Sequence, residues 1–107
     1  MIELNSGFFP HEDKIVIYDP FYTWDGTNYN GASILALAKL GASKGYSLIY
    51  SNGVNLFFLR NDVLNDLEAR GHGFNNTNDV KALYKRLENS RIGQDPFNRP
   101  YMRSDDL

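Results

Sequence analysis

The sequence predicts a small α/β domain, with a sheet of three to four strands and about three helices in two or three layers. Two local patterns and the composition indicate this class. Apolar residues recur at helical spacing between residues 34 and 41, and two β-prone runs flank the turn dipeptide Asn52-Gly53. The chain has 107 residues, 42% hydrophobic and 22% charged, which is typical of one small globular domain.

The helix is predicted from its apolar face. Ile34, Leu37, Ala38 and Gly41 follow the i, i+3, i+4, i+7 spacing that places side chains on one side of a helix. Gly45 then stands where a helix end favours a left-handed residue. We therefore expect a helix that ends just before Gly45 and whose apolar face is covered by the sheet.

A β-hairpin is expected to follow this helix. The runs Tyr46–Ser51 and Val54–Arg60 are rich in β-formers and are separated by Asn52-Gly53. Asparagine and glycine tolerate positive φ at both central positions of a type I′ turn. The sequence therefore predicts a tight hairpin with a type I′ turn at these two residues.

Two short strands are expected before the helix, in residues 1–6 and in Lys14–Tyr18, the latter because it is rich in β-branched residues. Beyond the hairpin, Asn61 or Asp62 can cap a helix over Val63–Arg70. An amphipathic helix over Asp79–Asn89 follows from the apolar spacing of residues 80, 83, 84 and 87. The remaining residues are polar and contain two prolines. We expect one α/β domain over residues 1–90 and a polar tail over 91–107 that is extended or partly disordered.

The loop between Asp19 and Asn30 is the candidate binding segment. Long loops with this many aromatic residues are uncommon unless they bind a ligand or pack against their own domain. One interpretation is structural, with Trp24 and its neighbours covering one end of the core and Asp25-Gly26 forming a turn. The other is a ligand pocket with aromatic walls and a few polar groups. Its candidate ligand-facing residues are Asp19, Tyr22, Trp24, Asp25, Asn28 and Tyr29.

Composition excludes several classes of site and location. Without cysteine the chain has no disulfide, no thiolate nucleophile and none of the usual structural zinc sites. A net charge of −2 argues against a nucleic-acid-binding protein, which needs a basic face. His11 and His72 have no spacing that suggests a metal site, so none is expected. There is no apolar run near the ~20 residues of a membrane span and no secretion signal, so we expect a cytoplasmic protein without membrane contact.

Four short patterns carry a resemblance to a known family: YDP, WDGTxYxGAS, LGxxKGY and GVNxFFxRxD. They lie within IELNS, IVIYDPFYTWDGTNYNGASILALAKLGASKGYSLIY and GVNLFFLRND, which together cover about residues 2–62. This part of the chain resembles the C-terminal part of FkbM-like proteins, which are related to class I S-adenosylmethionine-dependent methyltransferases. The fold implied is the C-terminal half of a Rossmann-like methyltransferase.

The resemblance implies which part of that fold is present. Ile2–Asn5 would be the fifth strand, Gly31–Lys44 the last long helix, and Tyr46–Arg60 the antiparallel sixth and seventh strands. Loop Phe8–Asn30 would lie on the acceptor-substrate side. The glycine-rich loop and the acidic residue that hold S-adenosylmethionine belong to the N-terminal half and have no counterpart here. We therefore expect no cofactor-binding residue in this chain and no catalysis by the chain alone.

Three function classes remain open at this point. The chain is a methyltransferase-related domain that needs a separate cofactor-binding chain, a small-ligand-binding module that uses the loop 19–30, or a homo-oligomeric interaction protein that uses an exposed sheet edge. The strand at Ile2–Asn5 would lack its parallel neighbour, which leaves one edge and the adjacent apolar helix face uncovered. The candidates to cover it are Lys14–Tyr18, the C-terminal helix Asp79–Asn89 with the polar tail, and a second copy. Because the first is short and the second is polar, we expect a homodimer.

Overall fold

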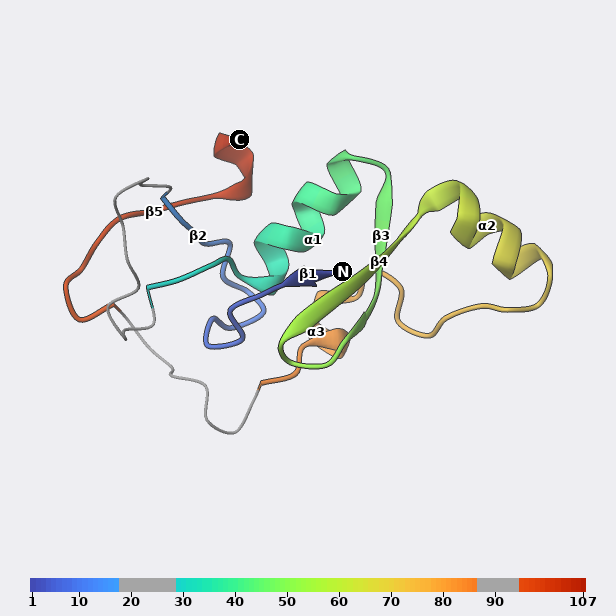
Figure 1. Ribbon diagram of the computed structural model, residues 1–107, viewed down its shortest axis with the longest axis horizontal. Helices are drawn as coiled ribbons and strands as arrows, with labels where there is room; N and C mark the ends of the chain where they lie inside the picture. The colour runs from blue at the N-terminus through green and yellow to red at the C-terminus, as the bar shows by residue number, and fades with distance from the viewer. Residues whose placement is uncertain (18–28, 87–94) are drawn as a thin grey trace.

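The computed structural model describes residues 1–17, 29–86 and 95–107 of the chain (Figure 1). Among these residues it has a small α/β fold with a three-stranded sheet, a two-stranded sheet and three α-helices. The α/β class is confirmed, and the five strands exceed the three to four expected. In chain order the elements are β1 (Ile2–Glu3), β2 (Ile15–Val16), α1 (Ile34–Ser43), β3 (Tyr46–Ser51), β4 (Asn55–Arg60), α2 (Asn61–Ala69), α3 (Val80–Leu83), β5 (Tyr101–Met102) and the 3₁₀ turn η1 (Ser104–Asp106).

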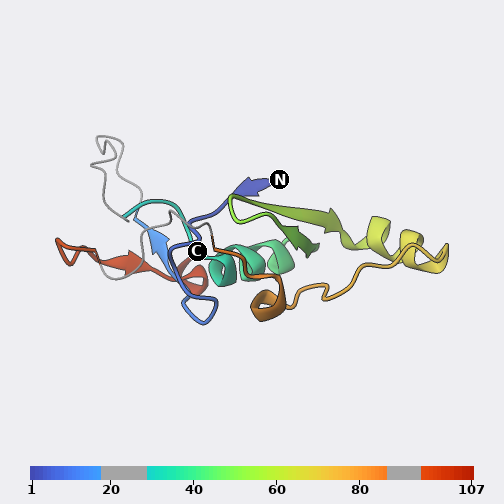
Figure 2. The same ribbon diagram turned by 90° about the horizontal axis from the view of Figure 1, so that it is seen from below.

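The three-stranded sheet has the order β1-β4-β3, and both pairings are antiparallel. α1 lies on one face of this sheet, so sheet and helix form two layers (Figure 2). The core between them is apolar, with Ile34, Leu48 and Leu56 fully buried. β1 is an edge strand of this sheet. Because Leu4 N donates to Val54 O, the alternation along the strand points the Glu3 N–H away from β4.

The predicted helix is confirmed as α1. Its N-terminus is capped by Ser33, whose Oγ accepts a hydrogen bond from Ala36 N at 3.2 Å. Ile34 and Ala38 of the predicted apolar face are buried against the sheet. The helix ends at Ser43, with Lys44 as C-cap, and Gly45 has φ +82° as the sequence predicted.

The hairpin β3–β4 is confirmed, but its predicted turn type is wrong. Of Asn52 and Gly53, only Gly53 has positive φ, at +91°. The side-chain Oδ1 of Asn52 accepts hydrogen bonds from Val54 N at 3.0 Å and Asn55 N at 2.8 Å. Because this side chain stands in for a backbone acceptor, Asn52 closes the turn as a flanking residue and Gly53-Val54 lie at its tip.

The second sheet pairs β2 with β5, from the two ends of the chain, with Ile15 opposite Met102. Residues 95–107 were expected to be extended or partly disordered, whereas the structure has β5 and η1 there. Residues 95–107 are ordered in this way by contacts with residues 1–32, which no local sequence pattern predicts. The two-stranded sheet lies at one end of the molecule and α2 at the other (Figure 1).

The helices beyond the hairpin differ in detail from the prediction. α2 begins at Asn61, with Arg60 at the N-cap and without a side-chain capping bond, so neither predicted cap is used. α3 ends at Leu83 instead of continuing toward residue 89, because Tyr84 is extended, with ψ 129°. The Tyr84 hydroxyl donates to Ser6 O at 2.9 Å, which ties the chain to the N-terminal segment. Residues 87–89 of the predicted helix lie outside the described residues.

Candidate binding site

Five of the six candidate residues of the aromatic loop, namely Asp19, Tyr22, Trp24, Asp25 and Asn28, lie outside the described residues. The sixth, Tyr29, is only 5% exposed. Its hydroxyl donates to Pro100 O at 2.5 Å, and its ring centroid lies 5.0 Å from that of Tyr101. The guanidinium carbon of Arg99 lies 4.1 Å from the Tyr29 centroid. The Tyr29 side chain is therefore enclosed by the C-terminal segment.

Asp95 organises that segment. Its carboxylate accepts hydrogen bonds from Arg99 Nε at 2.8 Å, Arg99 Nη2 at 3.1 Å, and the backbone N–H groups of Phe97 and Arg99. The Arg99 side chain is the main reason that the pKa of Asp95 is lowered to about 2, against the opposing effect of burial. Asp95 is thus ionised at neutral pH and fully engaged in holding this loop, at whose surface Phe97 is 67% exposed.

Asp13 fastens η1 to the rest of the chain. It accepts hydrogen bonds from Ser104 N at 2.8 Å, Ser104 Oγ at 2.7 Å and Lys39 Nζ at 3.2 Å. Burial acts to raise the pKa of Asp13, but the bonds from Ser104 and Lys39 together outweigh it and hold that pKa below its usual value. The lowered pKa of Asp13, like that of Asp95, is therefore explained by the hydrogen bonds that hold the fold together.

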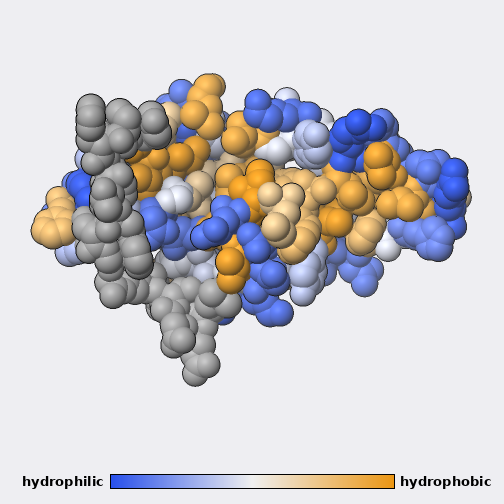
Figure 3. Space-filling model, viewed as in Figure 1, coloured by the Kyte–Doolittle hydropathy of each residue, from blue (hydrophilic) through white to orange (hydrophobic). Residues whose placement is uncertain are grey.

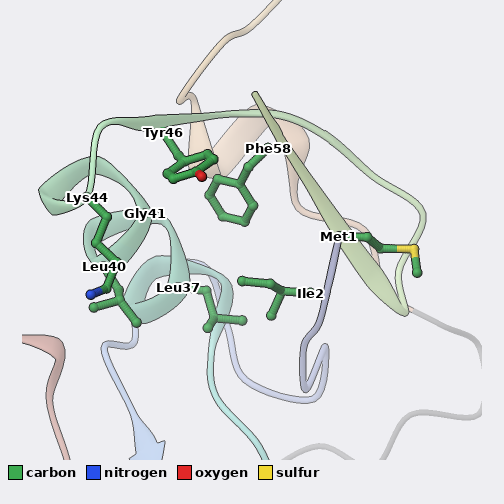
Figure 4. A pocket seen from close by; sticks show the side chains of 8 residues that line it. All are labelled: Met1, Ile2, Leu37, Leu40, Gly41, Lys44, Tyr46 and Phe58. Carbon is green, nitrogen blue, oxygen red and sulfur yellow. The ribbon is translucent and has the colours of Figure 1, made fainter. Parts of the chain in front are cut away.

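An open apolar hollow of about 280 Å³ lies between β1 and α1 (Figure 4). One wall is Leu37, Leu40 and Gly41 of α1, and Phe58 of β4 faces them. The remaining lining residues are Met1, Ile2, Lys44 and Tyr46. Met1 is 77% and Ile2 45% exposed, and apolar residues gather over the middle of the face seen in Figure 3. An apolar surface of this kind is typical of a binding site.

Gly41 makes the wall of this hollow possible. A Cβ at this position would lie 2.6 Å from Cε1 of Phe58, closer than side chains approach one another. Glycine is unfavourable inside a helix, and here its absent side chain gives the Phe58 ring its place against α1. The predicted apolar face of the helix thus serves two purposes, because Ile34 and Ala38 fill the core while Leu37 and Gly41 line the hollow.

The described residues offer little for acid–base or metal chemistry. No group of three or more potential metal ligands occurs among residues 1–17, 29–86 and 95–107. His72 is exposed, and His11 is exposed and stacks on Phe9 with a centroid distance of 5.9 Å. Within the described part of the chain, no helix is long and apolar enough to cross a membrane. What the hollow can do is bind an apolar group.

Comparisons with known protein families, with characterised proteins and with solved structures find no match to this chain. The interpretation of the site therefore depends on its own geometry. Sequence reasoning predicted an uncovered face beside the first strand but did not identify Leu40, Lys44, Tyr46 or Phe58 as its lining. The sequence signal that could have identified this lining was the short first strand, because so short a strand cannot cover two apolar turns of α1.

Proposed function

We propose that this chain is a methyltransferase-related interaction domain that forms a homodimer through β1 and does not bind S-adenosylmethionine by itself. The observation that carries the proposal is the edge strand β1 beside an open apolar hollow. Exposed edge strands are sites of pairing with another chain. Two copies of β1 related by a two-fold axis would join their sheets and cover Met1 and Ile2 of both.

The rest of the described chain supports this proposal because it leaves β1 and its hollow open. The described part of Lys14–Tyr18 pairs with β5 and not with β1. Of the C-terminal helix and tail, α3 packs on α1 and β3, β5 pairs with β2, and η1 packs on α1. In the part of the chain that the structure describes, the outer edge of the first segment is occupied beyond Leu4, where Asn5 N donates to Ala32 O at 2.9 Å. We propose a second copy as the cover of β1.

The methyltransferase part of the proposal is supported by the order of elements. A short strand, a helix and an antiparallel hairpin occur in the order β1, α1 and β3–β4, with β2 between the first two. These are the elements that the FkbM-like resemblance assigns to residues 2–60. The residues of that family that hold S-adenosylmethionine have no counterpart in this sequence. Any methyl transfer would therefore need a cofactor site formed by residues outside this sequence.

Sedimentation equilibrium at low micromolar concentration tests the dimer. We expect twice the chain mass of 12.2 kDa and an interface that buries more than ~1,000 Å² in total. Ile2→Glu should give a monomer, because it places a charge at the proposed contact, whereas Tyr50→Glu, an exposed site on β3, should leave the dimer intact. A wild-type chain that sediments at 12.2 kDa would end this part of the proposal.

Isothermal titration calorimetry tests the cofactor statement. The isolated chain should show no binding heat with S-adenosylmethionine, since the loop and the acid that would hold it are missing. Binding with a micromolar Kd, about −8 kcal/mol, would mean that the family resemblance assigns the cofactor site wrongly.

A further inference from the structure

The hollow between β1 and α1 has a single charged side chain in its lining, that of Lys44. Two other lysines are engaged: Lys14 pairs with Glu12 at 2.7 Å and Lys39 with Asp13 at 3.2 Å. Lys44, by contrast, forms no ion pair with any residue that the structure describes. Its side chain runs along α1, and its nitrogen ends beside Leu40 (Figure 4). An apolar hollow with the Lys44 ammonium in its lining, and the α-amino group of Met1 at its other end, is complementary to a molecule with an apolar chain and a negative group.

The hollow is polarised from one end to the other. Met1 and Ile2 lie at one end, and Lys44 and Tyr46 lie at the opposite end (Figure 4). The Tyr46 hydroxyl points toward Phe58, whereas the Lys44 nitrogen ends beside Leu40 (Figure 4).

The size of the hollow limits the ligand. Its volume of about 280 Å³ is slightly below the range of sites for drug-sized molecules. A single alkyl chain of medium length suits an open hollow of this size.

We propose that this hollow binds a medium-chain carboxylate, with the alkyl chain along Leu37, Gly41 and Phe58 and the carboxylate at Lys44. Pairing of two copies along β1 would close the Ile2 end and leave the Lys44 end open. This inference therefore goes beyond the proposed dimer and does not depend on it.

The local electrostatics make carboxylate binding depend on the charge of Lys44. The carboxyl end of a helix carries a partial negative charge, which disfavours an anion there, and Lys44 is the C-cap of α1. Without its ammonium, the hollow should prefer a neutral alkyl ligand over a carboxylate. The effect of the ligand's charge on the Kd should therefore depend on whether residue 44 is charged.

Isothermal titration calorimetry of the full chain with hexanoate, octanoate and decanoate, all below their micellar concentrations, tests the proposal. Each added methylene should strengthen binding about fourfold until the hollow is full. Lys44→Gln should weaken octanoate binding about tenfold and leave binding of the neutral probe 1-octanol unchanged. Lys81→Gln, an exposed lysine on α3, is the matched control and should change neither.

Gly41→Ala provides a second test that does not alter charge. Its methyl group would push the Phe58 ring into the hollow and should weaken octanoate and 1-octanol alike, with circular dichroism confirming the fold. In wild-type chain, octanoate should shift the amide resonances of Leu37, Gly41 and Phe58.

Several results would overturn the inference. These are no octanoate binding, equal binding of octanoate and 1-octanol, or octanoate binding that Lys44→Gln leaves unchanged. Octanoate binding that weakens as the protein concentration rises would show that a second copy fills the hollow, which overturns this inference and supports the dimer. A monomer that binds octanoate through Lys44 would instead remove only the dimer.

Discussion

The three-stranded sheet with α1 and the two-stranded sheet β2–β5 differ in what is buried around them. The first encloses apolar side chains, Ile34, Leu48 and Leu56, from elements close together in the sequence. The second joins the two ends of the chain and encloses polar groups beside the buried rings of Phe8 and Tyr29, with Asp95 only 2% exposed and Asp13 bonded to Ser104 across 91 residues. Apolar burial is non-directional and tolerant, whereas buried polar groups need specific partners. We therefore expect the first region to set global stability and the second to respond to single hydrogen bonds.

The largest effect should come from the apolar core. Leu48→Ala should lower the free energy of unfolding by about 2–5 kcal/mol, because it removes buried methyl groups and leaves a cavity. Urea denaturation followed by circular dichroism measures this. Val63→Ala, at a largely exposed site on α2, should change the same quantity by less than about 0.5 kcal/mol. Equal effects at both sites would contradict the assigned core.

The next effect should come from the polar fastening of η1. Asp13→Ala removes the acceptor of two bonds from Ser104 and one from Lys39, and should cost about 1–3 kcal/mol. The loss should be local, visible as faster amide exchange at Ser104 while Leu48 stays protected. Asp105→Ala is the matched control, since its contact with Lys39 is exposed and 3.7 Å long and should contribute less than about 1 kcal/mol.

Two tyrosines of the second region should respond with opposite sign. Tyr29→Phe loses the bond to Pro100 O and should destabilise the chain by about 1 kcal/mol. The Tyr101 hydroxyl is buried and has no hydrogen-bond partner among the described residues, and burial is the main cause that raises its pKa to about 12. Tyr101→Phe should therefore be neutral or stabilising by about 1 kcal/mol. Thermal unfolding of both variants decides this, and a matching loss in both would show that the hydroxyl of Tyr101 is satisfied in solution.

The smallest effect should be faster amide exchange around Asp95 at low pH. The pKa of Asp95 in the folded chain is about 2, below its ordinary value of 3.8, so the folded state binds this proton more weakly than the unfolded state. Its stabilisation is present above about pH 4 and is lost as the pH falls through about 2. Amide exchange at Phe97 and Arg99, whose N–H groups donate to Asp95, should accelerate in that window. In Arg99→Gln the acceleration should begin at higher pH, and an unchanged profile would contradict Arg99 as the cause.

The two regions also differ in how well sequence reasoning predicted them. The helix at 34–43 and the hairpin strands at 46–60 were predicted because their signals lie within a few residues: apolar spacing, Gly45 and the turn dipeptide. The turn type was wrong because the Asn52 side chain competes for the backbone donors of the turn. Of the candidate ligand-facing residues, Tyr29 is described and is enclosed by the C-terminal segment, and the other five stay predictions.

The α/β class, the apolar face of α1, a helix end just before Gly45 and the β3–β4 pair could all be predicted from the sequence. Each depends on contacts between residues close together in the chain, at most 14 positions apart in the hairpin, and such contacts leave a periodic or compositional trace. Only the tertiary structure decided that Tyr101–Met102 pairs with Ile15–Val16 and that Asp13 holds Ser104. It also decided that Leu37, Gly41 and Phe58 leave a hollow open beside β1. These features join residues up to 91 positions apart through single hydrogen bonds and the shapes of facing side chains, for which a linear sequence has no periodic signal.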